Sequence, residues 1–466
     1  MAAPLVLVMA AGEGTRMRSS TPKMLHPVCG RAMVAWPILA ARAAGGTTGR
    51  VAAIVSPGRD ISAGLPEGVE TVEQPVSDGT GGAIRAASSL IEEAETVLVL
   101  SGDVPLISAD TIAAMTEAHE AGEAAATMLT IELDDPGSYG RVVRTAAGDV
   151  ETVVEAKAAG DADASQLAIR EINAGTYLFD AAPLAKALAG LSNDNAQGEY
   201  YLPDVFTALR AEGRTVAAFQ TDDLAVTMGI NNRVQLAEVE AEARRRLLEA
   251  HMLAGVTIVD PASTWIDADV DLAQDVRVEP GTSLQGHTTV ARRSVIGPLS
   301  TVIECEIGAE ATVLRSHVEG ATIEDGAAIG PFAYLRPGTV MGAGSKAGAS
   351  VEIKNSHIGK GAKVPHLSYV GDADVGPGSN IGAGSITANY DGFRKNRTTI
   401  GRDVRIGVDT MLIAPVEVGD SAYTGAGAVL KDDVPDGALA VSENSQRNID
   451  GYAADKAAKM REEQDK

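Results

Sequence analysis

Near the N-terminus, the chain has a cluster of residue types suited to binding a phosphate-like anion. The apolar run Leu5–Met9 predicts a buried strand. It leads into a loop where Gly12 and Gly14 let backbone N–H groups approach an anion closely. Arg16 and Lys23 add positive charge beside that loop. This combination predicts a phosphate-binding loop at the end of a strand.

Oxygen donors suited to a metal ion occur further along the first half. Asp103 follows the apolar run Val97–Leu100, and a carboxylate at a strand end beside a phosphate loop suits Mg²⁺. An ordinary turn aspartate is the alternative. The segment Gly229-Ile-Asn231-Asn232-Arg233 predicts a turn into a helix with Asn232 as its N-cap.

A second set of chemical groups lies in the C-terminal half. His366 stands in a polar segment, and a histidine of near-neutral pKa is a natural base for an amine that attacks a thioester. Arg336 and Lys354 are suited to holding a phosphate, and Tyr369 and Asn380 to binding that phosphate or a sugar ring. These residues predict acyl transfer to a phosphorylated sugar.

Two halves of different periodicity position these groups. Apolar runs alternate with helical segments up to about residue 230, which predicts an α/β Rossmann-like domain with a mostly parallel sheet. The runs are Leu5–Met9, Val51–Val55, Val97–Leu100 and Ala125–Leu133, and Thr111–Ala121 is an amphipathic segment. Ligands bind beyond the carboxyl ends of such strands, where both the glycine loop and Asp103 would lie.

From about residue 256 the sequence repeats every six residues. Five positions spaced by six illustrate the pattern, Ile400, Ile406, Leu412, Val418 and Thr424, and glycine follows four of them. A hexapeptide period predicts a parallel β-helix, interrupted by a protruding loop at Asn389–Thr399. The segment 233–252 contains no glycine or proline and predicts a helix that connects the halves.

Bulk properties narrow the class of protein. The 466 residues carry a formal net charge of −24, which argues against nucleic acid or an anionic membrane as the main partner. Two cysteines cannot build a disulfide framework, and no apolar run approaches the length of a membrane span. We therefore expect a cytoplasmic enzyme without a membrane-inserted segment.

Both halves resemble known enzymes. The motif A-A-G-x-G-T-R followed by P-K resembles sugar-1-phosphate nucleotidyltransferases, and the hexapeptide repeat resembles the left-handed β-helix of acyltransferases. The whole chain resembles the bacterial bifunctional N-acetylglucosamine-1-phosphate uridyltransferases/glucosamine-1-phosphate acetyltransferases. This resemblance implies acetyl transfer from acetyl-CoA to glucosamine-1-phosphate, then uridylyl transfer from UTP with Mg²⁺, in a homotrimer. It divides the chain into a uridylyltransferase domain (1–232), a linker helix (233–252), a left-handed β-helix acetyltransferase domain (253–444) and a tail (445–466).

The resemblance also assigns roles to individual residues. Those with expected catalytic roles are Arg16, Lys23 and His366. Those expected to hold the metal are Asp103 and Asn231. Those expected to bind UTP or the UDP-sugar are Ala10, Ala11, Gly12, Lys23, Gln74, Gly79, Thr80, Gly140, Glu155, Asn173 and Asn231. Those expected to bind glucosamine-1-phosphate are Arg336, Lys354, Tyr369 and Asn380, with Glu352 beside the amine. Those expected to bind acetyl-CoA are Ala383, Asn389, Tyr390, Val408 and Ala426.

Two positions depart from the family pattern, and both concern acetyl-CoA. Val408 replaces a usual serine, and Glu443 replaces a residue that is often basic. Two alternatives to the bifunctional enzyme also stay open. One is a nucleotidyltransferase whose β-helix only trimerises it, and the other is a non-catalytic exchange or scaffold subunit.

Overall fold

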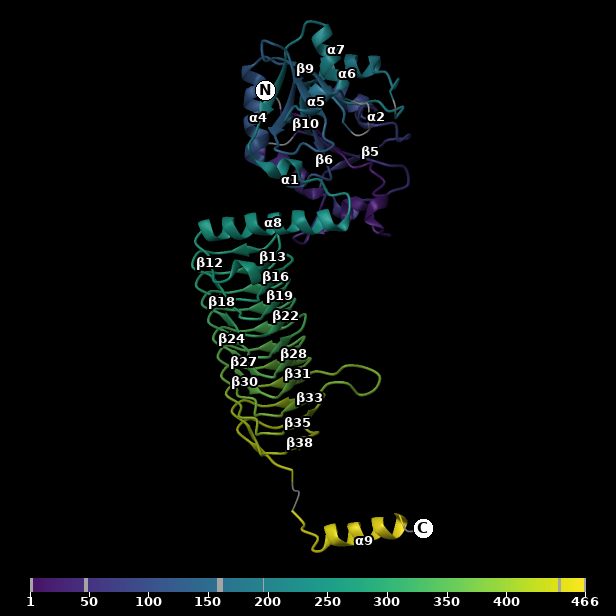
Figure 1. Ribbon diagram of the computed structural model, residues 1–466. Helices are drawn as coiled ribbons and strands as arrows, with labels where there is room; N and C mark the ends of the chain where they lie inside the picture. The colour runs from purple at the N-terminus through teal and green to yellow at the C-terminus, as the bar shows by residue number, and fades with distance from the viewer. Residues whose placement is uncertain (1–2, 46–48, 157–161, 196, 443–445, 465–466) are drawn as a thin grey trace. The chain divides into compact units, whose positions relative to one another are not determined.

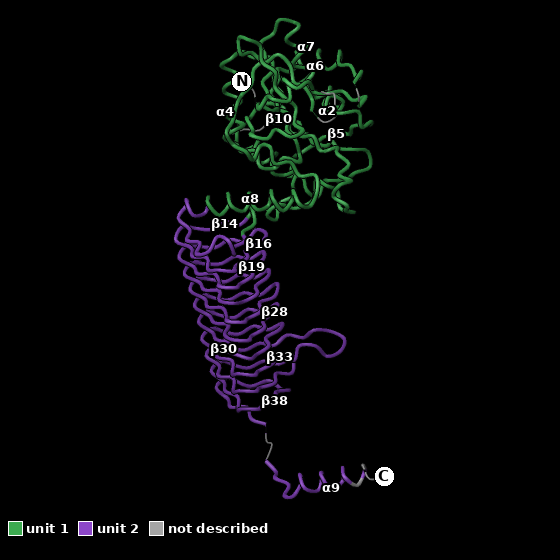
Figure 2. The backbone as a smooth tube through the Cα atoms, viewed as in Figure 1, with its two compact units in different colours: residues 1–250, 266–269 green, residues 251–265, 270–466 purple. Residues whose placement is uncertain are grey.

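The structure is a computed structural model that describes residues 3–45, 49–156, 162–195, 197–442 and 446–464. The chain forms two compact units, which Figure 2 distinguishes by colour. The first comprises residues 1–250 and 266–269, and the second comprises residues 251–265 and 270–466.

A mixed β-sheet forms the centre of the first unit. Its main path has the order β11-β7-β10-β6-β1-β4-β5. The strands of this path are β1 (Leu5–Met9), β4 (Val51–Val55), β5 (Glu70–Glu73), β6 (Thr96–Ser101), β7 (Ala126–Glu132), β10 (Glu171–Asp180) and β11 (Val216–Gln220). Among the described strands of this main path, β10 alone is antiparallel to its neighbours, so the mostly parallel sheet predicted from the sequence is confirmed. Beside β10 lie β8 (Arg141–Arg144) and β9 (Val150–Val154), and β2 (Pro27–Val28) pairs with β3 (Arg31–Ala32).

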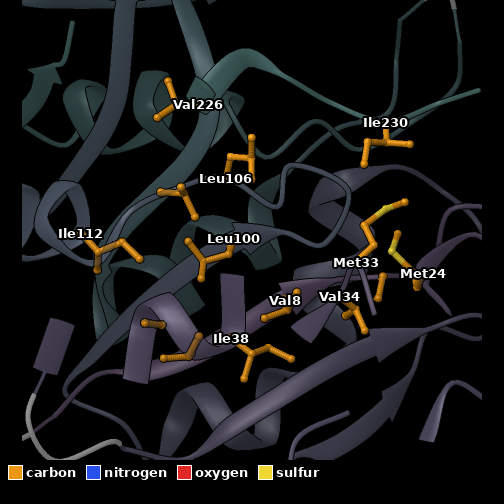
Figure 3. Packing of buried hydrophobic residues seen from close by; sticks show 14 of the residues in the cluster. Val8, Met24, Met33, Val34, Ile38, Leu100, Leu106, Ile112, Val226 and Ile230 are labelled. Carbon is orange, nitrogen blue, oxygen red and sulfur yellow. The ribbon is translucent and has the colours of Figure 1, made fainter. Parts of the chain in front are cut away.

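The apolar runs form strands because both faces of this sheet are covered. In β1, Val6 and Val8 pack into one hydrophobic cluster, whereas Leu5 and Leu7 pack into another. Successive side chains of a strand point to opposite faces, so an unbroken apolar run is what a strand buried on both faces requires. Figure 3 shows the cluster around Val8, with Leu100 and Ile38 beside it.

Helices connect the strands of the first unit. They are α1 (Ala35–Gly45), α2 (Thr80–Ala86), α3 (Ser88–Glu92), α4 (Ala109–Ala121), α5 (Ala164–Leu167), α6 (Ala181–Gly190) and α7 (Asp204–Ala211), with the 3₁₀ turns η1 (Thr15–Met17), η2 (Lys23–Leu25), η3 (Ser62–Gly64) and η4 (Leu224–Thr227). Helix α8 (Arg233–Leu253) follows them and begins where the sequence predicts. The side chain of Asn232 accepts hydrogen bonds from the amides of Val234 (2.9 Å) and Gln235 (3.0 Å), which confirms the predicted N-cap.

The second unit is a parallel β-helix whose strands form three ladders (Figure 1). The first ladder contains β12 (Thr257–Ile258), β15 (Arg277–Val278), β18 (Val295–Ile296), β21 (Thr312–Val313), β24 (Ala328–Ile329), β27 (Lys346–Ala349) and β30 (Lys363–His366). The second contains β13 (Trp265–Ile266), β16 (Ser283–Gln285), β19 (Thr301–Ile303), β22 (His317–Glu319), β25 (Tyr334–Leu335), β28 (Glu352–Lys354), β31 (Tyr369–Gly371), β33 (Ile386–Ala388), β35 (Met411–Ile413) and β38 (Val429–Leu430). The third contains β14 (Asp271–Leu272), β17 (Thr289–Val290), β20 (Glu306–Ile307), β23 (Thr322–Ile323), β26 (Val340–Met341), β29 (His357–Ile358), β32 (Ala373–Val375), β34 (Thr398–Ile400) and β36 (Val416–Val418). The 3₁₀ turn η5 (Pro261–Ser263) and the pair β37 (Tyr423–Thr424) and β39 (Leu439–Ala440) complete this unit's described turns and strands outside the ladders.

The six-residue period reflects one inward-pointing residue per strand. All five repeat positions, Ile400, Ile406, Leu412, Val418 and Thr424, are buried. At the corners, small hydroxyl side chains bond to the next coil. Ser294, for example, donates to the carbonyl of Gly308 (2.7 Å) and accepts from the amide of Ala311 (3.0 Å). The predicted architecture of an α/β unit followed by a parallel β-helix is confirmed, and the left hand implied by the resemblance stays a prediction.

The predicted interruption of the β-helix is a protruding loop. Strand β33 ends at Ala388 and β34 begins at Thr398, and the intervening chain extends away from the coils (Figure 1). Near the C-terminus, α9 (Tyr452–Gln464) is exposed wherever its side chains are described. No helix in the described ranges has the length and apolar character that crossing a membrane requires.

Candidate active sites

A cavity of about 360 Å³ lies at the carboxyl ends of the central strands of the first unit. Of the residues predicted to bind UTP or the metal, six line this cavity: Ala11, Gly12, Gln74, Gly79, Thr80 and Asp103. Ala10 follows β1, and its amide donates to the carbonyl of Ile54 in β4 (2.9 Å). Segments far apart in the sequence are thus brought to one edge of the sheet.

The two predicted metal ligands share one cationic partner. The Lys23 ammonium lies 2.7 Å from Asp103 Oδ2 and 3.3 Å from Asn231 Oδ1, and it is almost fully buried. The Arg16 guanidinium donates to the same Asn231 oxygen at 2.9 Å. Gly14 makes room for this arrangement, because a Cβ there would lie 2.6 Å from the Cβ of Lys23.

The same two oxygens fit a magnesium ion. Asp103 Oδ2 and Asn231 Oδ1 converge on a single cationic nitrogen, so they already face a common point of positive charge. Mg²⁺ prefers such hard oxygen donors and takes one or two protein ligands beside substrate phosphates. Among the residues that the structure describes, no group of three or more His, Cys, Asp or Glu side chains could hold a metal ion by itself.

A second group of predicted residues gathers around β10. The carbonyl of Gly140 accepts the amide of Asn173 (3.0 Å), and the Asn173 side chain donates to the Tyr177 hydroxyl (2.7 Å). A Cβ on Gly140 would lie 3.9 Å from a carboxylate oxygen of Glu155. Burial raises the pKa of Tyr177, and the Glu155 charge adds to this shift. Gly140, Glu155 and Asn173 therefore form one polar cluster.

Ser101 and Tyr139 connect this cluster with the metal side of the cavity. Ser101, which precedes Gly102 and Asp103, donates to the carbonyl of Gly175 in β10 (3.4 Å). The Tyr139 hydroxyl donates to the carbonyl of Thr227 (2.5 Å), and burial raises its pKa, with a further contribution from the Asp103 charge. Ser101 is not among the residues predicted from the sequence, because a serine at a strand end carries no distinctive signal.

In the second unit, charged side chains gather on the second ladder of the β-helix. The Arg336 guanidinium donates to Glu352 Oε1 (3.0 Å), and Glu352 stands in register with Tyr369. The Lys354 ammonium lies 3.4 Å from the buried carboxylate of Asp372. Arg336, Lys354, Tyr369 and Glu352 therefore lie close together, and their common role in binding glucosamine-1-phosphate stays a prediction.

Lys395 joins this cluster from the protruding loop, and the sequence analysis missed it. Its ammonium interacts with that of Lys354, which lowers the Lys395 pKa, and Arg336 lowers it further. A hydrogen bond shared with Lys395 and the Asp372 carboxylate raise the pKa of Lys354. No sequence signal connects a lysine in an irregular loop with a strand 41 positions earlier.

Asn389, which the resemblance assigns to acetyl-CoA, bonds to Asp372 and Tyr369. Its amide nitrogen donates to Asp372 Oδ2 at 2.5 Å and lies 3.4 Å from the Tyr369 hydroxyl. A buried carboxylate requires donors, so Asp372 holds this amide. In the described part of the chain, no hydrogen bond joins Asn389 to His366. The role of Asn389 in binding acetyl-CoA stays a prediction.

The remaining residues predicted to act in acetyl transfer lie along a corner of the β-helix. His366 and Ala383 each stand three residues before the paired Tyr369 and Ile386. The carbonyl of Ala383 accepts the amide of Asp409 (2.7 Å), and the carbonyl of Val408 accepts that of Gly427 (2.8 Å). His366, Ala383, Val408 and Ala426 thus follow one another in successive coils.

Three further predicted residues are placed as follows. Asn380 lies between Lys363 and Arg405 in a line of backbone bridges, away from the second ladder. Tyr390 is exposed on the protruding loop, where its hydroxyl donates to the carbonyl of Gly392 (2.6 Å). Glu443 lies outside the described residues.

A nucleotidyltransferase-like sheet followed by a hexapeptide β-helix defines a class of sugar-nucleotide transferases, and comparisons with known proteins agree. Residues 6–304 match the MobA-like NTP transferase domain family. The bifunctional protein GlmU of Mycobacterium tuberculosis (strain ATCC 25177 / H37Ra) is 51% identical over 458 residues, covering 96% of this chain and 91% of the relative. GlmU of Mycobacterium ulcerans (strain Agy99) is 49% identical over 459 residues, covering 97% and 93%. The chain belongs to the MobA-like NTP transferases and, within them, to the bifunctional GlmU family.

One solved structure also resembles the chain. It is described as UDP-glucose pyrophosphorylase complexed with UDP-glucose and covers 52% of this chain and 99% of its own, with 15% identity and a TM-score of 0.42. A likeness this remote has no bearing on function. Membership of the GlmU family confirms the predicted class, a bifunctional transferase of UDP-N-acetylglucosamine synthesis.

Proposed function

We propose that the first unit transfers a uridylyl group from UTP to N-acetylglucosamine-1-phosphate. A phosphate oxygen of the sugar phosphate attacks the α-phosphorus of UTP in line, a new P–O bond forms, and the bond to the β-phosphate breaks. The products are UDP-N-acetylglucosamine and pyrophosphate. The observation that supports this most is the convergence of Lys23 and Arg16 on Asn231, with Asp103 beside them.

In this proposal the cations of the chain bind and orient the triphosphate. Negative charge shifts onto the leaving pyrophosphate in the transition state, and preorganised positive groups stabilise it. Arg16 and Lys23 supply that charge. Asp103 and Asn231 would hold Mg²⁺, which neutralises phosphate charge when it is bound. The β10 cluster of Gly140, Glu155 and Asn173 would bind the sugar.

We propose that the second unit acetylates glucosamine-1-phosphate. The amine attacks the carbonyl carbon of acetyl-CoA, an amide bond forms, and the C–S bond breaks to release coenzyme A. His366 accepts a proton from the attacking amine. Arg336, Lys354 and Lys395 form a group of three cations suited to the sugar phosphate, and this group is the observation that supports the proposal most.

The corner of His366, Ala383, Val408 and Ala426 is the surface that we assign to acetyl-CoA. These residues follow one another beyond the proposed base, and Val408 is 49% exposed, so a thioester could lie along them. Acetyl-CoA and glucosamine-1-phosphate are cytoplasmic metabolites, and we propose that the enzyme acts in the cytoplasm.

We also propose a homotrimer. Large apolar side chains are exposed at one corner of the β-helix, with Leu299, Phe332 and Leu367 each more than 60% exposed. All three have positive φ angles, as do Arg315 and Ser350 at the same corner, and exposed apolar side chains gathered in this way are typical of an interaction surface. Burial of these side chains against another copy would remove this apolar area from water. Light scattering that shows a fully active monomer would contradict the trimer.

Two assays on the purified full-length protein test the two activities. One follows coenzyme A release from acetyl-CoA with glucosamine-1-phosphate, and the other follows pyrophosphate release from UTP with N-acetylglucosamine-1-phosphate and Mg²⁺. Asp103→Ala should abolish only the second, and His366→Ala only the first. Release of pyrophosphate without any acetyl transfer would favour the alternative in which the β-helix only trimerises the enzyme.

A further inference from the structure

Asp78 lies beside Gln74, one of the residues that the resemblance assigns to UTP and, in particular, to its uracil base. Gln74 follows β5 and is 5% exposed, and its backbone amide donates to the carbonyl of Val55. Its side-chain nitrogen donates to Asp78 Oδ1 at 3.0 Å and to the carbonyl of Gly79 at 3.3 Å. Gln74 and Gly79 line the cavity described above.

Both partners of the Gln74 side chain are acceptors, and this fixes the orientation of its amide. A carboxylate and a backbone carbonyl have no proton to donate, so the NH₂ group of Gln74 must face them. The two N–H bonds of that group are then both used. Only the amide oxygen Oε1 stays available to a ligand, and no hydrogen bond to Oε1 is seen within the described ranges.

Asp78 is itself held from the neighbouring helix. The Arg85 guanidinium lies 3.4 Å from Asp78 Oδ2 and stacks 3.9 Å from the centre of the Tyr200 ring. The backbone also fixes this loop, because the amide of Tyr200 donates to the Asp78 carbonyl (2.7 Å). Gly82 in α2 makes room for the carboxylate, since a Cβ there would lie 1.8 Å from Asp78 Oδ1.

We infer that Asp78 is a positioning residue that makes Gln74 select a nucleobase with an N–H donor, as uracil has at N3. Cytosine carries a lone pair at N3, which would face the lone pairs of Gln74 Oε1. A site built to accept a hydrogen bond rejects a base that offers a lone pair instead, because both groups then stay unpaired. This inference rests on the proposed binding of UTP and predicts that the same site rejects CTP.

The test compares kcat/KM for UTP and CTP in pyrophosphate release by the full-length enzyme. Asp78→Ala frees the Gln74 amide to rotate, and we expect the UTP/CTP ratio to fall by about tenfold or more. Gly82→Ala removes no polar group, yet its methyl group displaces the carboxylate. We expect the same direction of change, although alanine favours the helix over glycine. Asp60→Ala, on an exposed loop, is the matched control.

A merely structural role would give a different result. It would lower the rates with UTP and CTP together and leave their ratio unchanged. An unchanged ratio in both Asp78→Ala and Gly82→Ala would overturn the inference while the proposed function stands. A wild-type enzyme without UTP-dependent turnover would overturn the proposed function itself. Thermal unfolding of each full-length variant reports whether the first unit is folded.

Discussion

Replacing Lys23 by methionine tests the electrostatics of the proposed uridylyl transfer. Methionine has about the length of the lysine stem but no charge, so the buried volume around Gly14 is kept. The variant loses the ammonium that lies 2.7 Å from Asp103 and 3.3 Å from Asn231. If Lys23 binds the triphosphate, the transition state loses a charged hydrogen bond in this variant.

The expected magnitude follows from that geometry. A hydrogen bond to a charged group contributes about 1.5–3 kcal/mol, which corresponds to a decrease in kcat/KM of between about tenfold and about a hundredfold. The free energy of unfolding should fall by only about 1 kcal/mol, because Asp103 is 30% exposed and water can solvate its carboxylate.

Initial rates of pyrophosphate release against UTP concentration measure this loss, and thermal unfolding measures stability. The matched control is Lys186→Met, which removes an exposed lysine paired with Glu212 at 2.9 Å in the same unit. The control should keep full activity. A folded Lys23→Met enzyme within about threefold of the wild-type kcat/KM would refute the proposed role of Lys23, because its ammonium would then contribute less than a single neutral hydrogen bond.

Four further outcomes are expected. His366→Ala should lower acetyl transfer by about a hundredfold or more and leave uridylyl transfer unchanged in paired assays. Lys395→Ala should raise KM for glucosamine-1-phosphate more than it lowers kcat. In the wild-type enzyme, this KM should begin to rise at a lower alkaline pH than it would with a lysine of ordinary pKa, because Lys354 lowers the pKa of Lys395. Val408→Ser should raise acetyltransferase kcat/KM by about a few-fold through one added hydrogen bond near the thioester, and no gain would show that this role is already filled. Burial lowers the pKa of His119 below its ordinary value of 6.5, so the folded state binds fewer protons than the unfolded state. Calorimetry should show that the contribution of His119 to the free energy of unfolding is intact above about pH 6.5 and is lost as the pH falls below this value.

The elements that local pattern determines were predictable from the sequence. The run Leu5–Met9 is a strand over the predicted residues because its alternate side chains enter two different cores. The N-cap at Asn232 follows from a side chain that bonds to amides two and three residues away. The six-residue period follows from one buried residue per strand. Each of these signals lies within a few neighbouring positions.

The polar groups that come from distant segments were not predictable in the same way. Lys395 joins Lys354 from an irregular loop, and Ser101 reaches Gly175 across 74 positions. Their side chains are ordinary for exposed loops and strand ends. Only the packing of the sheet and the coils determines which of them meet, and a single sequence records no such pairing.

The loop that carries Asp78 shows why composition alone misleads at such positions. The segment Pro75–Gly79 has the residue types of an ordinary solvent-exposed turn, and a turn aspartate is commonly explained by local backbone contacts. Here its carboxylate instead bonds to Gln74 and Arg85, and the absence of a side chain at Gly82 permits both contacts. The chemical meaning of Asp78 thus depends on a glycine in a helix that begins two residues later. A substitution at Gly82 that would stabilise the isolated helix is therefore the one expected to impair base selection.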